Sequence, residues 1–296
     1  MSILQLSPQV IELGTIDLDF SQVLCLPIEI REMLGDPNKF LAEKVLAFTT
    51  GSSQICLILF KNPADDWMLR IVYYDDPNNP KTTGLDNFLS QSLSGQALRD
   101  RLDFCSKCIA QKFMRKHKRV VDLGGGSGSY FFEALKHIPA MPDGFHWNVI
   151  DKDEISLQEG QVRAEQGGYS QIITFENFNF NDKKALPKED EKADFAVLIG
   201  VLCGMDKDTA TKCLRKAKEH IKPGGQILAA TLLKKAFDED PRTFRILCNV
   251  GGWQLRPKTM DEVLQCFNDA GWGVREVMSE RKNGDGQYAI VHAVAE

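Results

Sequence analysis

The sequence predicts an α/β fold: a mixed β-sheet with helices on both faces. Three features predict it. From about residue 86, short β-prone runs alternate with longer amphipathic runs, the order expected of parallel strands joined by crossover helices. One β-prone run, 119–123, leads directly into a glycine-rich stretch at 124–128. Near the end of the chain, two β-prone runs flank an Asn-Gly turn, which indicates an antiparallel hairpin at one edge of the sheet.

The individual elements follow from the spacing of the apolar residues. A helix over 95–115 comes first, because apolar residues recur there every three or four positions. Further helices are expected at 129–137, 154–166, 207–220 and 259–270. Strands are expected at 119–123, 146–151, 171–176, 194–200, 225–232, 273–278 and 287–295.

The first 85 residues have a different pattern. The β-prone runs 54–60 and 67–74 flank a turn-forming segment at 61–66, which predicts a buried hairpin. A polar, proline-containing break follows at 75–80. We therefore expect a small N-terminal α+β accessory region over 1–85, serving as a lid, substrate-binding or dimer region, and a larger domain over 86–296.

Composition and charge indicate a globular protein of the cytoplasm. The 296 residues are 43% apolar and 26% charged, and the net charge is −5. No apolar run approaches the roughly 18 residues of a membrane helix, and the N-terminal residues do not have the pattern of a signal peptide. The basic stretch 112–119 is interpreted as the charged end of a helix. We expect no membrane partner and no nucleic-acid partner.

The eight cysteines are scattered, mostly through apolar runs, as is typical of reduced, buried thiols. Cys105 and Cys108 form a C-x-x-C pair, but a zinc site needs four ligands and the sequence has no second pair. Cys105 also falls on the apolar stripe of the helix expected at 95–115. We therefore expect core packing for Cys105 and no metal site.

The glycine-rich stretch predicts a ligand site at the carboxyl end of the first strand of the sheet. A dinucleotide loop requires G-x-G-x-x-G, and neither Gly124 nor Gly126 starts that pattern. The strand also ends in Asp122, whose carboxylate would repel a diphosphate. The same carboxylate would favour the cationic ammonium or sulfonium of S-adenosylmethionine.

A second acid, Asp151, ends the strand expected at 146–151. A carboxylate at this point can accept hydrogen bonds from both hydroxyls of a ribose, in dinucleotide and S-adenosylmethionine sites alike. The alternative is that Asp151 is an ordinary N-cap of the following helix.

The order and spacing of these motifs resemble the class I S-adenosylmethionine-dependent methyltransferases, most closely the small-molecule O-methyltransferases, over about 95–296. The resemblance implies a Rossmann-like seven-stranded mixed sheet with an antiparallel C-terminal hairpin. It also implies transfer of a methyl group by in-line displacement to a small-molecule acceptor, at oxygen rather than nitrogen or sulfur, and it leaves a homodimer open. The similar segments are 121–128, 201–208, 221–226, 251–256, 260–264 and 270–272.

The resemblance assigns cofactor contacts by position. Asp151 would hold the ribose, and Asp122 would lie by the charged groups of the methionine part. Asn179 stands where the family usually has an acid near the adenine amino group, and its carbonyl can accept the same hydrogen bond; a plain loop position is the alternative. Phe180 would flank the adenine ring, and the cofactor amino group would lie by the backbone of Gly200. The methionine part would be wrapped by Gly124, Gly126 and Gly128.

The sequence assigns no catalytic residue. Related enzymes that deprotonate a phenol often carry a histidine after the fourth strand, where this chain has Cys203. Proximity and orientation alone can contribute about 7–11 kcal/mol to a displacement on an activated donor. Asp206 and Asp208 are interpreted as caps of the next helix. Other uses of S-adenosylmethionine, or cofactor binding without catalysis, remain alternatives.

Two further segments bear on ligands. Arg99 or Arg101, on the helix before the glycine-rich stretch, could reach the cofactor carboxylate, and the alternative is a solvated helix face. The segment 240–256 is expected to cover the substrate, with Arg242, Arg245, Trp253 and Arg256 available to an anionic, planar molecule. The alternative is a solvated face with a tryptophan in the core.

Overall fold

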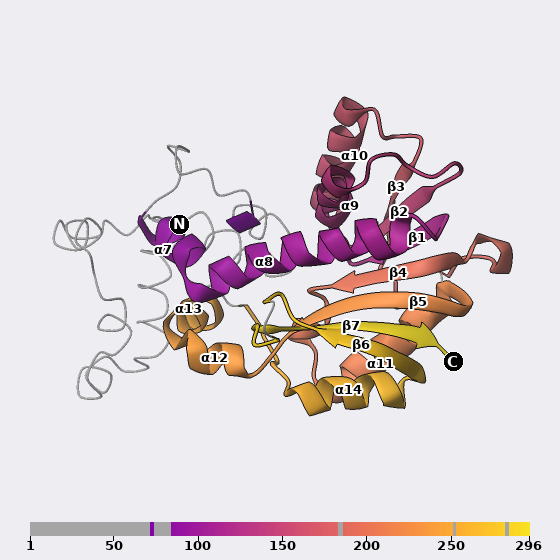
Figure 1. Cartoon of the computed structure of the whole chain (residues 1–296). Helices are drawn as coiled ribbons and strands as arrows, with labels where there is room; N and C mark the ends of the chain where they lie inside the picture. Colours follow the sequence, from indigo (N-terminus) through magenta and orange to yellow (C-terminus); the bar gives the residue numbers. More distant parts are fainter. Residues whose placement is uncertain (1–71, 74–83, 183–185, 251–252, 282–283) are drawn as a thin grey trace, which may run out of the picture.

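A computed structural model describes residues 72–73, 84–182, 186–250, 253–281 and 284–296 (Figure 1). Its centre is one seven-stranded mixed sheet in the order β3-β2-β1-β4-β5-β7-β6. The predicted fold class, including the antiparallel hairpin, is confirmed. The strands are β1 (Arg119–Leu123), β2 (His146–Asp151), β3 (Ile173–Asn177), β4 (Ala193–Ile199), β5 (Ile221–Leu232), β6 (Trp272–Met278) and β7 (Tyr288–Ala295).

The strand order reverses at β1. This strand pairs in parallel with β2 on one side and with β4 on the other. Strands that follow along the chain extend the sheet outwards in both directions, and β7 returns antiparallel between β5 and β6. Open α/β sheets bind ligands at the carboxyl ends of their strands where the order reverses, so the end of β1 is the expected site.

Helices cover both faces of the sheet (Figure 1). On one face lie α8 (Leu93–Cys108), its π-helical extension η1 (Ile109–Met114), α9 (Ser129–Ala134) and α10 (Glu154–Gly167). On the other lie α11 (Lys207–Glu219) and α14 (Met260–Asp269). Alternate residues of β1 serve the two layers: Val120 packs with the first group and Val121 with the second, as the two-residue period of a strand requires.

Shorter elements complete the described chain. The N-terminal side contributes α7 (Gly84–Gln91), and a short η2 (Leu135–His137) ends α9. After β3 come η4 (Glu189–Glu191) and η5 (Leu202–Gly204). The segment after β5 holds α12 (Lys235–Glu239), α13 (Pro241–Arg245) and η6 (Ile246–Val250).

Several boundaries differ from the prediction, and three of the differences change how the sheet is described. β3 begins at Ile173, two residues later than expected. β5 begins at Ile221, four residues earlier than expected, and includes the turn predicted before the strand as a bulge. Ile221 pairs with Ala193 of β4, and the next pair is Gln226 with Phe195, so β5 advances by five residues where β4 advances by two. The β6–β7 connection spans 279–287, longer than a tight Asn-Gly hairpin, because the side chain of Glu280 folds back to bind the backbone of this segment.

Most of the predicted N-terminal region, including the run 54–60, lies outside the described residues. Val72 and Tyr73 are described and helical, so the strand predicted over 67–74 is wrong at these two positions. Both side chains are buried, whereas neighbours in a half-buried strand face opposite sides. The domain boundary near residue 85 stays a prediction.

Candidate cofactor-binding site

The glycine-rich loop leaves β1 at its carboxyl end and turns into α9. The Gly124 amide donates to the Ile150 carbonyl at 2.7 Å, so the loop starts beside the end of β2. Gly124 has a φ of +73°, and a Cβ there would lie 2.5 Å from Cγ2 of Val201. Only glycine fits this backbone conformation in this space. Gly126 and Gly128 also have positive φ values, and Gly128 is the N-cap of α9.

Asp151 joins the end of β2 to this loop. Its Oδ2 accepts from the Gly126 amide and its Oδ1 from the Asp153 amide, both at 2.9 Å. Burial raises the pKa of the Asp151 carboxyl, and the two amides oppose that shift. The N-cap of α10 is Asp153, whose carboxylate accepts from the amide of Ile155. The N-cap alternative for Asp151 is therefore wrong.

Asp122 lies beneath the loop. It is 1% exposed, and a Cβ at Gly125 would lie 2.5 Å from its carboxyl carbon. The carboxylate therefore packs directly against the loop backbone. The structure brings Asp122, the glycines and Asp151 together at the switch point of the sheet, as the sequence predicts.

Phe180 and Asn179 follow β3 and differ in their surroundings. The ring of Phe180 is buried and approaches Gly124, whereas Asn179 is exposed. The side-chain carbonyl of Asn179 accepts from the backbone amide of Asn181 at 3.1 Å, a local turn contact. The imidazole of His220 is buried, with 1% of the residue exposed, and its Nε2 lies 3.0 Å from the Phe180 carbonyl. Because a carbonyl can only accept, Nε2 is the donor. The sequence does not reveal this contact, because His220 reads only as the end of a helix.

The loop after β4 begins at Gly200, whose φ is +83° and whose amide donates to Ala230 at 3.1 Å. Cys203 is buried, and its sulfur accepts from the Leu232 amide at 3.2 Å. This sulfur is therefore a structural acceptor in the present arrangement. Asp206 accepts from the Thr209 amide at 2.8 Å and caps α11, as predicted, whereas Asp208 lies in the first turn of that helix and is not its cap.

Lys258 holds the same loop and was not found from the sequence. It is 3% exposed, and its ammonium donates to the carbonyls of Leu202 at 2.9 Å, Arg256 at 3.1 Å and Met205. The Arg256 amide in turn donates to the Cys203 carbonyl at 2.7 Å. The segment before α14 is thus joined to the loop after β4.

The two arginines considered on α8 face in different directions. Arg99 donates to the Val72 carbonyl at 3.3 Å and to the side chain of Gln96 at 3.1 Å. Arg101 is buried, and a Cβ at Gly200 would lie 3.7 Å from its Nη1. Only Arg101 therefore faces the candidate site.

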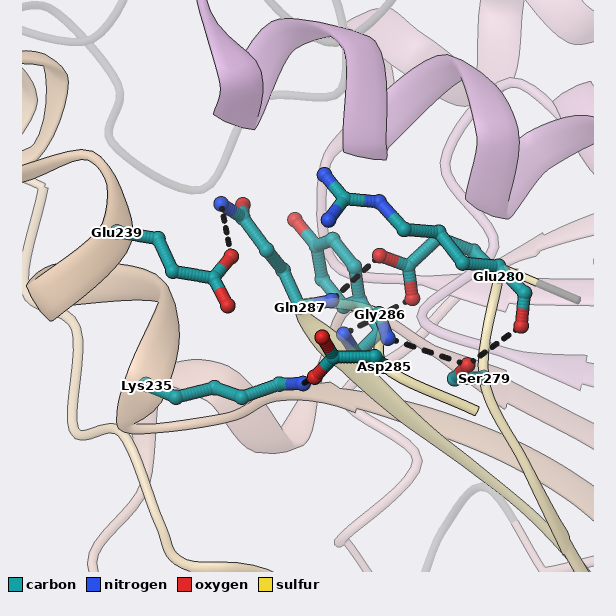
Figure 2. Close-up of polar contacts among 9 residues, drawn as sticks. Lys235, Glu239, Ser279, Glu280, Asp285, Gly286 and Gln287 are labelled. Atoms are coloured by element: carbon teal, nitrogen blue, oxygen red, sulfur yellow. Dashed lines mark hydrogen bonds and ion pairs between the residues drawn. The ribbon is translucent and has the colours of Figure 1, made fainter. Parts of the chain in front are cut away.

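A polar network fixes the β6–β7 connection at the same edge of the sheet (Figure 2). The Glu280 carboxylate accepts from the amides of Gln287 and Tyr288, the latter at 3.0 Å. Lys235 of α12 pairs with Asp285 at 2.6 Å, and Gln287 donates to Glu239 of α12 at 3.2 Å. Tyr288, the first residue of β7, is therefore held firmly beside the site.

Comparison with known proteins identifies the family. A family model described as a methyltransferase domain matches residues 114–271, just over half of the chain. The chain belongs to this methyltransferase family. The matched residues include the glycine-rich loop, Asp151 and the loop after β4. The predicted class, S-adenosylmethionine-dependent methyltransferase, and its cofactor are thereby confirmed.

Two curated proteins are similar over part of their length. The ubiquinone/menaquinone biosynthesis C-methyltransferase UbiE of Bartonella tribocorum is 33% identical over 113 residues, 38% of this chain and 40% of that protein. The protein YnbC of Escherichia coli K12 is 24% identical over 198 residues, 64% of this chain and 33% of that protein. The chain thus spans well under half the length of each.

Solved structures share the fold of this methyltransferase. A possible exported protein from Bordetella parapertussis has a TM-score of 0.65 at 16% identity, covering 86% of this chain and 96% of that one. The mitomycin 7-O-methyltransferase MmcR has a TM-score of 0.53 at 19% identity, covering 94% and 76%. In the part of the chain that the structure describes, no helix is long and apolar enough to cross a membrane.

Proposed function

We propose that this chain transfers the methyl group of S-adenosylmethionine to a small-molecule acceptor, at oxygen rather than nitrogen or sulfur. Methyl transfer is supported by the family, and an oxygen acceptor by the likeness to MmcR. One observation carries the proposal: the 2.9 Å contact between Asp151 and the Gly126 amide, which joins the ribose-binding acid to the glycine-rich loop at the switch point.

The residues present fit the cofactor. Asp151 does not cap α10, and each of its carboxylate oxygens can accept a second hydrogen bond, so the two oxygens can accept from two ribose hydroxyls while keeping their backbone contacts. Gly124, Gly126 and Gly128 would wrap the methionine part, and Asp122 would lie by its charged groups. Phe180 would flank the adenine, while the Asn179 carbonyl would exchange its Asn181 contact for the adenine amino group. The backbone at Gly200 would lie by the cofactor amino group.

The bound cofactor supplies a methyl group already activated on a sulfonium. The chain then has to bind and orient the acceptor in line with that bond and exclude water, which can contribute about 7–11 kcal/mol. We assign no base to Cys203, whose sulfur is buried and accepts from the Leu232 amide within the fold. The proposed acceptor is therefore one that ionises readily, such as an acidic phenol.

Calorimetry tests the cofactor assignment. The purified chain is expected to bind S-adenosylmethionine and S-adenosylhomocysteine but not NAD. Asp151→Ala is expected to weaken both by roughly ten- to a hundredfold, the value of hydrogen bonds to a charged acceptor. Asp153→Ala is the matched control: it removes the α10 cap at a cost of about 1 kcal/mol in stability and leaves affinity unchanged. An unchanged affinity in Asp151→Ala contradicts the ribose assignment.

Product analysis tests the reaction. Incubation with cofactor and candidate phenols, thiols and amines is expected to yield methylated product and S-adenosylhomocysteine. Transfer of another cofactor group would favour the other transferases. Tight binding with no product from any acceptor would favour a cofactor-binding protein without catalysis.

Location, assembly and domain roles belong to the same proposal. Five buried free cysteines among the described residues suit a reducing compartment and support a cytoplasmic location: Cys105, Cys108, Cys203, Cys213 and Cys266.

We propose that 1–85 and 240–256 cover the substrate and that a homodimer forms through the N-terminal region. Light scattering of the full chain and of a chain starting at residue 86 tests the dimer.

A further inference from the structure

A buried arginine lies at the centre of a cluster of tyrosines beside Gly200. Arg101 of α8 is 2% exposed. Its Nε donates to the hydroxyl of Tyr130 at 3.0 Å, and its Nη2 donates to the hydroxyl of Tyr73. Its guanidinium carbon lies 4.6 Å from the ring centre of Tyr288. Three separate segments, before α7, in α9 and in β7, thus converge on one cation.

This cation has no anionic partner among the described residues. Burial raises the pKa of the Tyr130 and Tyr288 phenols, so both are neutral at pH 7 and leave the charge uncompensated. The nearby Glu280 carboxylate is bound to the amides of Gln287 and Tyr288 instead. A buried guanidinium is stabilised by an anionic partner, and a bound ligand can supply one.

The terminal nitrogens of the guanidinium face the proposed site. Arginine has five N–H donors, and the contacts to Tyr73 and Tyr130 use two of them. A Cβ at Gly200 would lie 3.7 Å from Nη1 and 3.9 Å from Nη2, so both terminal nitrogens face the end of β4. Tyr130 is in the first turn of α9, directly after the glycine-rich loop. An anion at the end of β4 can therefore meet the guanidinium edge-on.

We propose that Arg101, fixed by Tyr73 and Tyr130, is the receptor for a ligand carboxylate. The proposal rests on the proposed function, because the carboxylate belongs to one of the two molecules that meet at Gly200. One source is the methionine part of the cofactor, and the other is the methyl acceptor. The planar fork of arginine suits either, because it can donate two parallel hydrogen bonds to one carboxylate.

Two nucleosides separate these sources. S-adenosylhomocysteine carries the amino-acid carboxylate, whereas 5′-methylthioadenosine keeps the ribose and adenine and lacks it. If the cofactor is the source, Arg101→Met lowers the affinity for the first by roughly ten- to a hundredfold and leaves that for the second unchanged. Arg101→Lys, which keeps a charge without the fork, is expected to recover part of the loss. Arg99→Met, from the same helix, is the matched control and changes neither affinity.

If the acceptor is the source, both nucleoside affinities survive in Arg101→Met. In that case 4-hydroxybenzoate, used as the probe, binds to the wild type saturated with S-adenosylhomocysteine and fails to bind to the variant. Binding of 5′-methylthioadenosine shows that each variant is folded. The proposal is overturned if neither measurement depends on Arg101. Wild type that binds neither nucleoside contradicts the proposed function as well.

Discussion

Replacement of Lys258 by methionine tests how the loop after β4 is held. Methionine keeps most of the apolar stem and removes the ammonium that donates to Leu202, Met205 and Arg256. Hydrogen bonds from a charged group contribute about 1.5–3 kcal/mol each. Burial of the ammonium opposes this stabilisation and lowers the pKa of Lys258. We therefore expect Lys258→Met to lower the free energy of unfolding by about 3 kcal/mol in total.

Urea denaturation followed by circular dichroism measures this loss, with calorimetry of S-adenosylhomocysteine as a second readout. Affinity is expected to fall with stability, because the loosened loop carries Gly200. Lys234→Met is the matched control: this exposed lysine should change stability by less than about 0.5 kcal/mol. Equal stabilities of the two variants would refute the role assigned to Lys258.

Three further changes have defined outcomes. Gly124→Ala is expected to lower the free energy of unfolding by about 2 kcal/mol or more and to abolish cofactor binding, because position 124 has a positive φ and the new methyl group would clash with Val201. Adding Val201→Ala should restore part of the stability but not all of it. Full stability of the Gly124→Ala variant alone would contradict the geometry. Glu280→Gln should lower the free energy of unfolding, measured by urea titration, by about 1–3 kcal/mol, because the NH₂ of the new amide would face backbone N–H donors. Asp285→Asn, which removes the exposed ion pair with Lys235, is the control and should cost about 0.5 kcal/mol or less. Burial lowers the pKa of four histidines in the folded chain, so the unfolded chain binds more protons below about pH 6.5 and stability falls as the pH drops from there. Urea midpoints at pH 7.5 and 5.5 measure this loss, and His220→Gln should reduce it; the four are His117, His146, His220 and His292.

The positions of the glycine-rich loop and of Asp151 were predictable because their signals are local. The glycine-rich stretch requires positive φ values wherever it folds, and its place after a β-prone run fixes it at the end of a strand. Asp151 was less certain, since an acid before a helix is also a common N-cap. In the structure the N-cap of α10 is Asp153, two residues later, so the N-cap alternative for Asp151 is excluded.

The arginines of α8 show why contacts between distant segments were not predictable. Residues two apart on a helix point about 200° apart, so Arg99 and Arg101 cannot both face the site. Their neighbours in sequence do not decide which one does. The choice depends on contacts of Arg101 with Tyr130 and Tyr288, which lie far along the chain and are set by the packing of α8 on the sheet.

Lys258 and His220 were missed for a related reason: each acts on a distant backbone carbonyl, and a carbonyl has no signature in the sequence. Both bind loops at the carboxyl edge of the sheet, Lys258 the loop after β4 and His220 the one after β3. A loop without its own regular hydrogen bonds needs such donors to keep one shape. The side chains that set this shape therefore come from elements outside the recognised motifs, and variation there can change ligand choice while the glycine-rich loop stays the same.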